Sequence, residues 1–266
     1  MSFSVVTNIA SLNAQANMAR TEFGLSSALN RLSTGLRINS SGDDAAGLVV
    51  ANMHRSDATV LSQGIRNAND GLSALQIMDS ALDNVSQILD RMATLAAQSA
   101  STVTSDSSRT ILQAEFSALR TELDRQTAVA GVDSAYSYAV FVSNDGADGE
   151  VSGTVTGVTS TSLGINLSTI AAQADAETAV AAIATAVGTL GTSQGQIGTL
   201  QNQTQFAINL AQSQYTNTKA AESRIRDANV AEEAANMTRY NILTQSGVAA
   251  LAQANNASAS VLALLR

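Results

Sequence analysis

The side chains that could carry out chemistry in this chain are few, and their spacing does not assemble a catalytic site. His54 is the only histidine and cysteine is absent, whereas a metal site needs two or three further ligands at a useful spacing. The sequence has no HExxH motif, no convincing Ser, His and Asp set, and no glycine-rich phosphate loop after a strand. We therefore interpret His54 as a surface histidine and predict no enzyme, no metal site and no cofactor.

Two groups of carboxylates resemble paired general acids and bases, but helix capping explains them more simply. Asp43 and Asp44 stand where a helix is expected to begin, and negative side chains stabilise the positive end of a helix dipole. Ser41, three residues before Asp44, fits a loose capping box. Asp227 and Glu232-Glu233 lie near a second expected helix junction, so we assign them the same capping role.

The acidic pair at 43 and 44 lies in the stretch that organises the chain, residues 31–71. One helix ends there, a polar turn follows, and a much longer helix begins. Gly35 and Gly42 bracket the turn and adopt positive φ at little cost. This pattern predicts a hinge between two helices.

The composition favours thin helical layers over a thick globular interior. Aromatic residues make up 3% of the 266 residues and proline is absent, which suits long uninterrupted helices. The net charge of -8, with Lys219 as the only lysine, argues against a nucleic-acid partner. No segment approaches the ~20 consecutive apolar residues of a membrane span, and the N-terminus lacks the pattern of a cleavable signal.

Both ends of the chain carry weakly amphipathic helical patterns. The first repeats apolar residues at spacings of 4, 3, 4, 3 and 4, and a second set continues the rhythm on a shifted register; these residues are Val5, Ile9, Leu12, Ala16, Ala19 and Phe23, then Leu25, Leu29, Leu32 and Leu36. So narrow a stripe does not hold a helix alone. The last segment, 230–266, ends in an apolar tip of Val261, Leu262, Leu264 and Leu265. We predict that the terminal helices pair with each other and with copies of themselves.

The middle of the chain predicts long helices interrupted by one β-hairpin. A helix is expected from Asp44 to about Ser99, and glycines within it indicate very close packing of a neighbour at Gly47, Gly64 and Gly71. A polar connector, 101–109, leads into a third, antiparallel helix. The segment 131–168 reads as a hairpin at one end of the rod, turning at 144–146, and a further helix runs from after Thr169 to about Ala228.

These patterns predict a mainly α fold, an elongated antiparallel helical rod and coiled coil with a small β-hairpin region. We expect three domains. Residues 1–42 with 229–266 form a terminal coiled coil, residues 43–130 with 169–228 form the helical rod, and residues 131–168 form a short variable segment within the rod.

Three motifs resemble the signatures of bacterial flagellins. RLSTGLRINSSGDDAAGL and RNANDGLSALQ match the N-terminal signature, RIRDANVAEEAANMTRYNILTQSGVAALAQANN matches the C-terminal one, and the chain closes on VLALLR. The resemblance covers roughly residues 1–130 and 170–266 and indicates a short form without large outer variable domains. It implies a structural subunit that self-assembles into the helical filament of the bacterial flagellum for swimming, with the terminal helices lining its inner tube.

Two alternatives stay open. A hook-filament junction protein has related termini, although DDAAGL and RNANDG favour flagellin. An extracellular adhesive or binding protein would carry its activity in the central segment, but 131–168 is small for an independent domain.

The resemblance also implies partners and a location. It implies secretion through the flagellar type III export apparatus with a flagellin chaperone, residence in the extracellular filament, and contact with the filament cap and the hook-junction proteins. We assign self-assembly to apolar residues of the terminal helices, which are Val5, Ile9, Leu12, Phe23, Leu29, Leu32, Val261, Leu262 and Leu265. The positions that match the family's contacts with the vertebrate Toll-like flagellin receptor are Arg91, Leu95, Gln98, Leu112 and Glu115. Around them RMATLAAQ departs from the family's RxRELAxQ, with Ala93 and Thr94 in place of charged residues.

Overall fold

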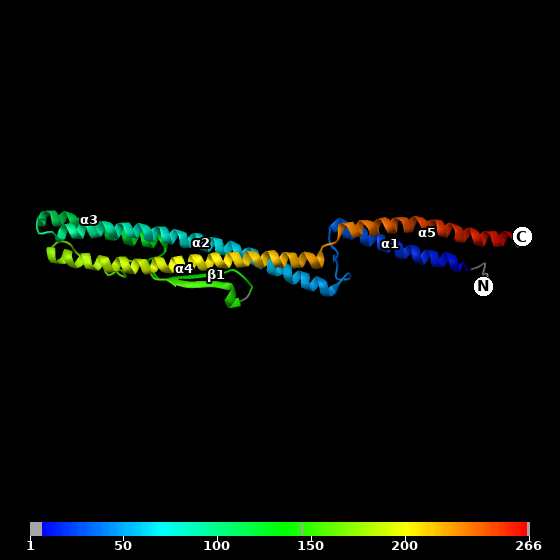
Figure 1. Ribbon diagram of the computed structural model, residues 1–266, viewed down its shortest axis with the longest axis horizontal. Helices are drawn as coiled ribbons and strands as arrows, with labels where there is room; N and C mark the ends of the chain where they lie inside the picture. The colour runs from blue at the N-terminus through cyan, green and yellow to red at the C-terminus, as the bar shows by residue number, and fades with distance from the viewer. Residues whose placement is uncertain (1–6, 145, 265–266) are drawn as a thin grey trace. The chain divides into compact units, whose positions relative to one another are not determined.

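The structure, a computed structural model, describes residues 7–144 and 146–264, without the side chains of residue 147 and residues 257–264. Within these residues the chain is mainly helical with one antiparallel β-hairpin, which confirms the predicted fold class (Figure 1). The elements, in chain order, are α1 Ile9–Thr34, α2 Ala45–Ala100, α3 Asp106–Ala130, β1 Tyr136–Phe141, the short 3-10 helix η1 Gly146–Gly149, β2 Glu150–Val155, α4 Gln173–Arg226 and α5 Val230–Leu264.

The chain divides into two compact units. The terminal unit consists of residues 1–56 and 218–266, and the central unit consists of residues 57–217. The helices α2 and α4 contribute residues to both units. The boundaries expected after residue 42 and before residue 229 therefore fall inside the terminal unit.

In the terminal unit, α1 and α5 lie side by side (Figure 1). Asn8 caps the start of α1 by accepting a hydrogen bond from the backbone N–H of Ser11 at 3.1 Å. Gly35 ends α1 in the left-handed conformation, with φ 72°, and its N–H bonds the carbonyl of Arg31. The positive φ explains why a glycine closes this helix.

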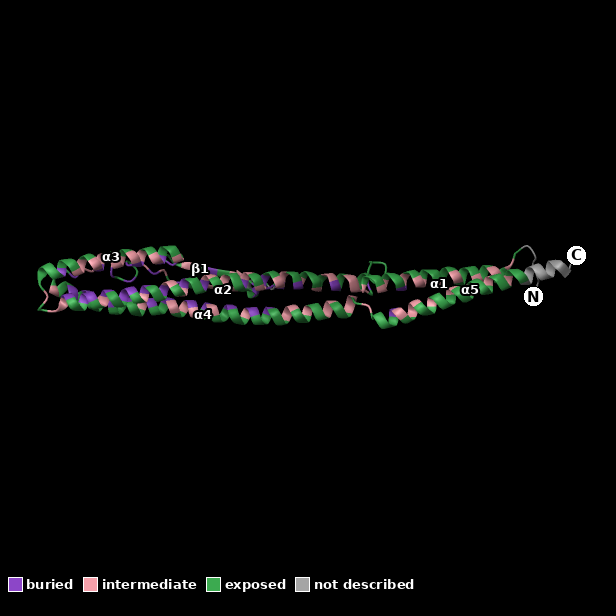
Figure 2. Ribbon diagram, turned by 90° about the horizontal axis from the view of Figure 1, so that it is seen from above, coloured by how far each residue is buried: buried purple, intermediate pink, exposed green. Residues whose placement is uncertain are grey.

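In the central unit, one apolar cluster joins α2, α3 and α4. The α2 stripe predicted from the sequence is confirmed, because its members Met78, Leu82, Val85, Leu89, Met92 and Ala96 are all buried. Phe116 and Leu123 of α3 complete the cluster together with Ile183, Leu190 and other small or branched residues of α4. Figure 2 shows buried residues gathered along α2, α3 and α4, while α1 and α5 are almost entirely intermediate or exposed.

The β-hairpin packs on the sides of two helices. Strands β1 and β2 pair antiparallel from Tyr136↔Val155 to Phe141↔Glu150. Val142 contacts α2 at Gly64, and Gly153 lies against Leu200 of α4. The expectation that the hairpin sits at the end of the helices was therefore wrong. Asp145, in the middle of the predicted turn, lies outside the described residues.

The close packing predicted at Gly47, Gly64 and Gly71 is confirmed. A Cβ on Gly64 would collide with the backbone carbonyl oxygen of Val142, and one on Gly71 would lie 2.6 Å from the Tyr138 hydroxyl. That hydroxyl shares a 2.9 Å hydrogen bond with the hydroxyl of Thr204 on α4, and burial raises the pKa of Tyr138. The two α2 glycines are thus notches that let the hairpin approach the helix.

Candidate functional site

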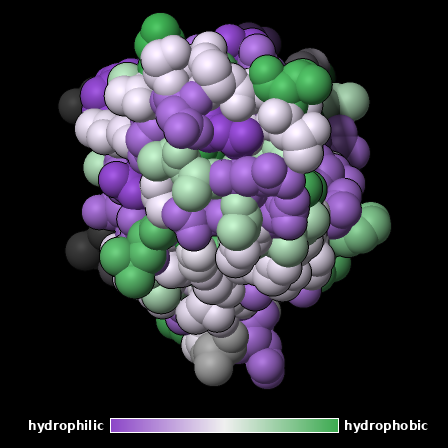
Figure 3. All heavy atoms as spheres, turned by 90° about the vertical axis from the view of Figure 1, so that its left-hand side faces the viewer, coloured by the Kyte–Doolittle hydropathy of each residue, from purple (hydrophilic) through white to green (hydrophobic). Residues whose placement is uncertain are grey.

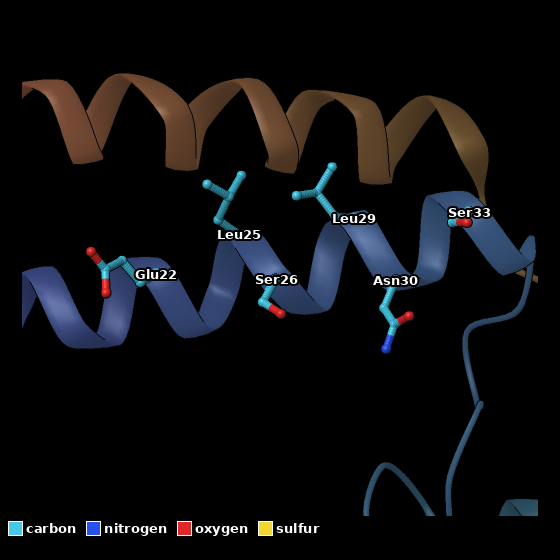
Figure 4. A pocket seen from close by; sticks show the side chains of 6 residues that line it. All are labelled: Glu22, Leu25, Ser26, Leu29, Asn30 and Ser33. Carbon is cyan, nitrogen blue, oxygen red and sulfur yellow. The ribbon is translucent and has the colours of Figure 1, made fainter.

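The seam between α1 and α5 is built mainly from small and polar residues, with a few larger apolar ones. On α1 the half-buried or buried positions recur in a heptad of Ser11, Ala14, Met18, Thr21, Leu25, Ala28 and Leu32, and only Ala28 is fully buried within this helix. In Figure 4, Leu25 and Leu29 point toward α5, whereas Ser26 and Asn30 point away from it. A seam this poor in apolar area buries little surface within one chain.

The apolar stripe predicted for α1 lies outside this seam. Ile9, Leu12 and Phe23 are 65%, 54% and 78% exposed, and the alanines between them are exposed as well. These residues, which the sequence assigns to self-assembly, are therefore not used in the contact between α1 and α5 of one chain. Among the other predicted assembly residues, Leu29 is exposed and Leu32 half-buried. Val5 and Leu265 lie outside the described residues, as do the side chains of Val261 and Leu262.

Large apolar side chains are exposed in both units. Those of the terminal unit lie on α1, at the start of α2 and on α5, and comprise Ile9, Leu12, Phe23, Leu29, Val49, Val50, Met53, Val230, Ile242, Leu243 and Val248. The α2–α3 end of the central unit presents separate apolar groups among polar ones (Figure 3). Where exposed apolar residues are contiguous, they mark interaction surfaces.

Three specific contacts tie α1 to α5. The guanidinium Nη1 of Arg31 lies 3.2 Å from a carboxylate oxygen of Glu233, which is only 8% exposed. Asn8 donates from its side-chain amide to the carbonyl of Ala254 at 2.9 Å, and Gly24 faces the ring of Tyr240. As the sequence suggested, Glu232 and Glu233 lie in the first turn of α5, where the helix dipole favours negative charge. The Asn229 side chain caps α5 through the Ala231 N–H, and Glu233 also pairs with Arg31.

The turn after α1 is fastened to the segment between α4 and α5. Leu36 and Asp227 form an antiparallel β-bridge, and backbone hydrogen bonds join Arg37 N–H to the carbonyl of Arg226 at 2.7 Å and Ala228 N–H to that of Gly35 at 2.9 Å. Two side chains reinforce the bridge reciprocally. Arg37 donates to the carbonyl of Ile225, and Arg226 donates to that of Ile38. The turn that the sequence predicts to be a hinge is thus joined to residues 226–228 by backbone hydrogen bonds.

Of the two aspartates of the turn, Asp44 has the capping role expected of it, whereas Asp43 bonds the turn that precedes the helix. Asp44 caps α2 by accepting the Gly47 N–H at 2.9 Å, so the cap is Asp44 itself and not Ser41. Asp43 accepts the N–H groups of Ser40 and Asn39 on one oxygen, together with the Ser40 hydroxyl. These donors, the Ser40 N–H foremost, lower the pKa of Asp43 below its ordinary value of 3.8.

Acidification is expected to open this turn. Because the pKa of Asp43 is lowered by folding, its contribution to stability is present above 3.8 and is lost as the pH falls through the lower folded value. The amide resonances of Asn39 and Ser40, followed by NMR, should therefore shift with a midpoint below 3.8 in the native protein and show no such step in Asp43→Asn. A midpoint at or above 3.8 would contradict the assignment.

The residues matched to the receptor contact differ in accessibility. Arg91 and Glu115 form an exposed ion pair across α2 and α3, with 2.6 Å between Nη2 and Oε1. Gln98 is exposed and Leu112 half-buried, whereas Leu95 belongs to the core and is 1% exposed. The structure thus brings four of the five residues to the surface and places Leu95 beneath them.

The described part of the chain shows no group of three or more side chains arranged to hold a metal ion. His54, the sequence's one imidazole, is half-buried on α2 near the turn. Among the described residues, every helix is too short in apolar length to cross a membrane.

Comparison with protein families gives two matches. Residues 5–133 match the bacterial flagellin N-terminal helical region, and residues 180–265 match the bacterial flagellin C-terminal helical region. The stretch between the two matches contains the β-hairpin.

Three related proteins align with nearly the whole length of this chain. A flagellin of Listeria monocytogenes is 34% identical, covering 94% of this chain and 95% of that protein. A flagellin of Halalkalibacterium halodurans is 34% identical over 97% and 98%, and the flagellar filament 33 kDa core protein of Treponema phagedenis is 32% identical over the same shares. The crystal structure of Bacillus cereus flagellin aligns with a TM-score of 0.48 and 26% identity, covering 59% of this chain and 94% of that one.

Proposed function

Because the chain belongs to the bacterial flagellin family and is a structural subunit of the flagellar filament, we propose that the exposed stripe of α1 is covered by neighbouring copies when the filament assembles. The filament is extracellular and serves swimming, and its subunits are structural proteins. The proposal concerns which surfaces of this chain meet in the polymer.

One observation carries the proposal: the apolar stripe of α1 faces away from α5. Ile9, Leu12 and Phe23 stay exposed, while the seam that meets the partner helix uses other residues, of which only Met18, Leu25 and Leu32 are large and apolar. Full burial of each such side chain is worth about 1.5–3 kcal/mol. In the monomer these side chains stay in water, and in the polymer their burial between subunits would stabilise the filament.

This arrangement couples folding of the terminal helices to assembly. Their intrachain seam offsets only part of the conformational entropy lost on ordering, and contacts between subunits supply the remainder. We propose accordingly that residues 1–42 with 229–266 line the inner tube, that residues 43–130 with 169–228 form the helical rod domain, and that residues 131–168 are the short variable segment within it.

Electron microscopy of the purified chain, incubated with short filament seeds in a precipitating salt, tests the assembly role. Such salts strengthen apolar burial, so long tubes with a helical repeat are expected. Persistent monomers would overturn the proposal. Growth that stops after a single layer would also overturn it and would indicate a hook-filament junction protein.

Partners beyond the chain itself follow from the same membership. We propose export through the flagellar type III apparatus with a flagellin chaperone, and contact with the filament cap and hook-junction proteins. We also propose that the chain carries no catalytic activity, since its acidic clusters already serve as caps and ion-pair partners. A motility screen in which acidic residues outside such contacts prove essential would contradict that view.

The exposed side of α2 and α3 is proposed to contact the Toll-like flagellin receptor. Arg91, Gln98 and Glu115 are accessible there, and Leu95 supports them from the core. Replacing Arg91 by alanine is expected to weaken receptor activation about tenfold, because interface arginines are common hot spots. A cell-based receptor reporter measures this, with the exposed Gln87→Ala, four residues away on α2, as control. Equal activation by both variants would exclude a contact at Arg91.

A further inference from the structure

The seam between α1 and α5 poses a question of register. Most of its α1 heptad positions are small or polar, and a pattern that repeats every seven residues pairs almost as well after a slip of one heptad. Yet the register decides how the α1 stripe lies beside the exposed Ile242 and Leu243 of α5, and so shapes the surface offered to other copies. Something in the seam must select one register.

The close approach of Gly24 and Tyr240 distinguishes one register from the others. A Cβ added to Gly24 would lie 2.6 Å from both Cε1 and Cζ of the Tyr240 ring and 3.0 Å from Cε2. The Tyr240 ring thus packs against the backbone of α1 at Gly24, in the space that the side chain of any other residue would fill. This space is called the notch below. Gly247, elsewhere in the seam, differs, since a Cβ there would meet the Met18 Cε at an ordinary 3.7 Å.

A second contact, one heptad away, fits the same register. Moving seven residues forward on α1 from Gly24 leads to Arg31, and moving seven residues back on α5 from Tyr240 leads to Glu233, which is the residue paired with Arg31 at 3.2 Å. Both contacts therefore specify the same antiparallel alignment. Polar pairs buried in coiled coils are best established in this role of fixing register.

We propose that Gly24 and Tyr240 determine the register of α1 against α5, with the Arg31–Glu233 pair reinforcing it. A slip of one heptad would place the Tyr240 ring against Asn17 or Arg31, neither of which offers a notch. The same slip would separate the buried Glu233 from Arg31 and leave its charge unpaired. The inference rests on the proposed assembly role only for its consequence, because the register itself is a property of the single chain.

Disulfide cross-linking of the full-length chain tests the register directly. The sequence contains no cysteine, so each introduced pair reports alone. Met18→Cys with Gly247→Cys samples the native register, since these positions are in contact, and Met18→Cys with Ala254→Cys samples a slip of one heptad. Gel mobility separates cross-links within a chain from those between chains. The native pair is expected to form at least tenfold faster.

A double-mutant cycle then identifies the residues responsible. Gly24→Ala and Tyr240→Ala should each reduce the preference for the native cross-link about tenfold, and the double variant should lose no more than either, because the two residues act as one device. Tyr240→Phe should retain the preference, since the ring and not the hydroxyl fills the notch. Ser26→Ala is the matched control, on the side of α1 that points away from α5 (Figure 4).

Three outcomes would overturn the register assignment. They are a preference that survives both Gly24→Ala and Tyr240→Ala, losses that multiply in the double variant, or an equal loss in Ser26→Ala. The assembly role fails by a different result, the absence of tubes from the native chain in electron microscopy, so the two proposals are separable.

Discussion

Replacing Leu12 or Phe23 with aspartate is expected to abolish filament growth while leaving the central unit folded. Both side chains are exposed on α1, 54% and 78% respectively, so neither change disturbs packing within the chain. In the filament, however, the new carboxylate would be buried without a partner, at a cost of about 3 kcal/mol or more. A loss of that size raises the critical concentration for growth more than hundredfold.

Asn13→Asp provides the matched control, because it adds the same charge to the same helix at an exposed polar position beside Leu12. Sedimentation of seeded reactions, with electron microscopy of the pellets, measures the critical concentration of each variant. The control is expected to polymerise at close to the native concentration. Filaments from Leu12→Asp and Phe23→Asp at native concentrations would show that the stripe stays exposed in the polymer.

Gly64→Ala is expected to destabilise the central unit by about 2–3 kcal/mol and to lower its Tm by roughly 5–10 °C. The added methyl would collide with the backbone carbonyl of Val142, and backbone cannot move aside as a flexible side chain does. The hairpin would have to lift from α2, which would weaken the Tyr138–Thr204 hydrogen bond and the packing below it. The higher helix propensity of alanine, about 1 kcal/mol, offsets only part of this loss.

Gly191→Ala separates close packing from helix propensity. Gly191 is also in a helix interior, but a Cβ there has no neighbour within 4 Å in the described structure. This variant should gain up to about 1 kcal/mol, so the two glycine substitutions should change stability in opposite directions. Calorimetry of the soluble monomers decides the matter. A Gly64→Ala variant that melts at or above the native temperature would show that the hairpin does not rely on the notch.

Local patterns in the sequence determined the long helices, their ends and the central core. The apolar stripe from Met78 to Ala96 became the buried face of α2, because a helix of period 3.6 sets its own faces. Asp44 and Gly35 mark helix ends through contacts with neighbours in the chain, which sequence spacing encodes. The family could also be identified from the sequence, since its motifs at 31–48 and 224–256 are contiguous runs of residues.

Only the tertiary structure decided which face of α1 meets α5. Apolar periodicity selected the stripe of Ile9, Leu12 and Phe23, which the structure leaves exposed, while Gly24 and Arg31 contact α5. Likewise, the sequence did not show that Glu233 pairs with Arg31 or that Leu95, matched to the receptor contact, lies in the core. A single sequence records the period of a helix but not its rotation or register, because contacts between residues far apart in the chain fix both of these.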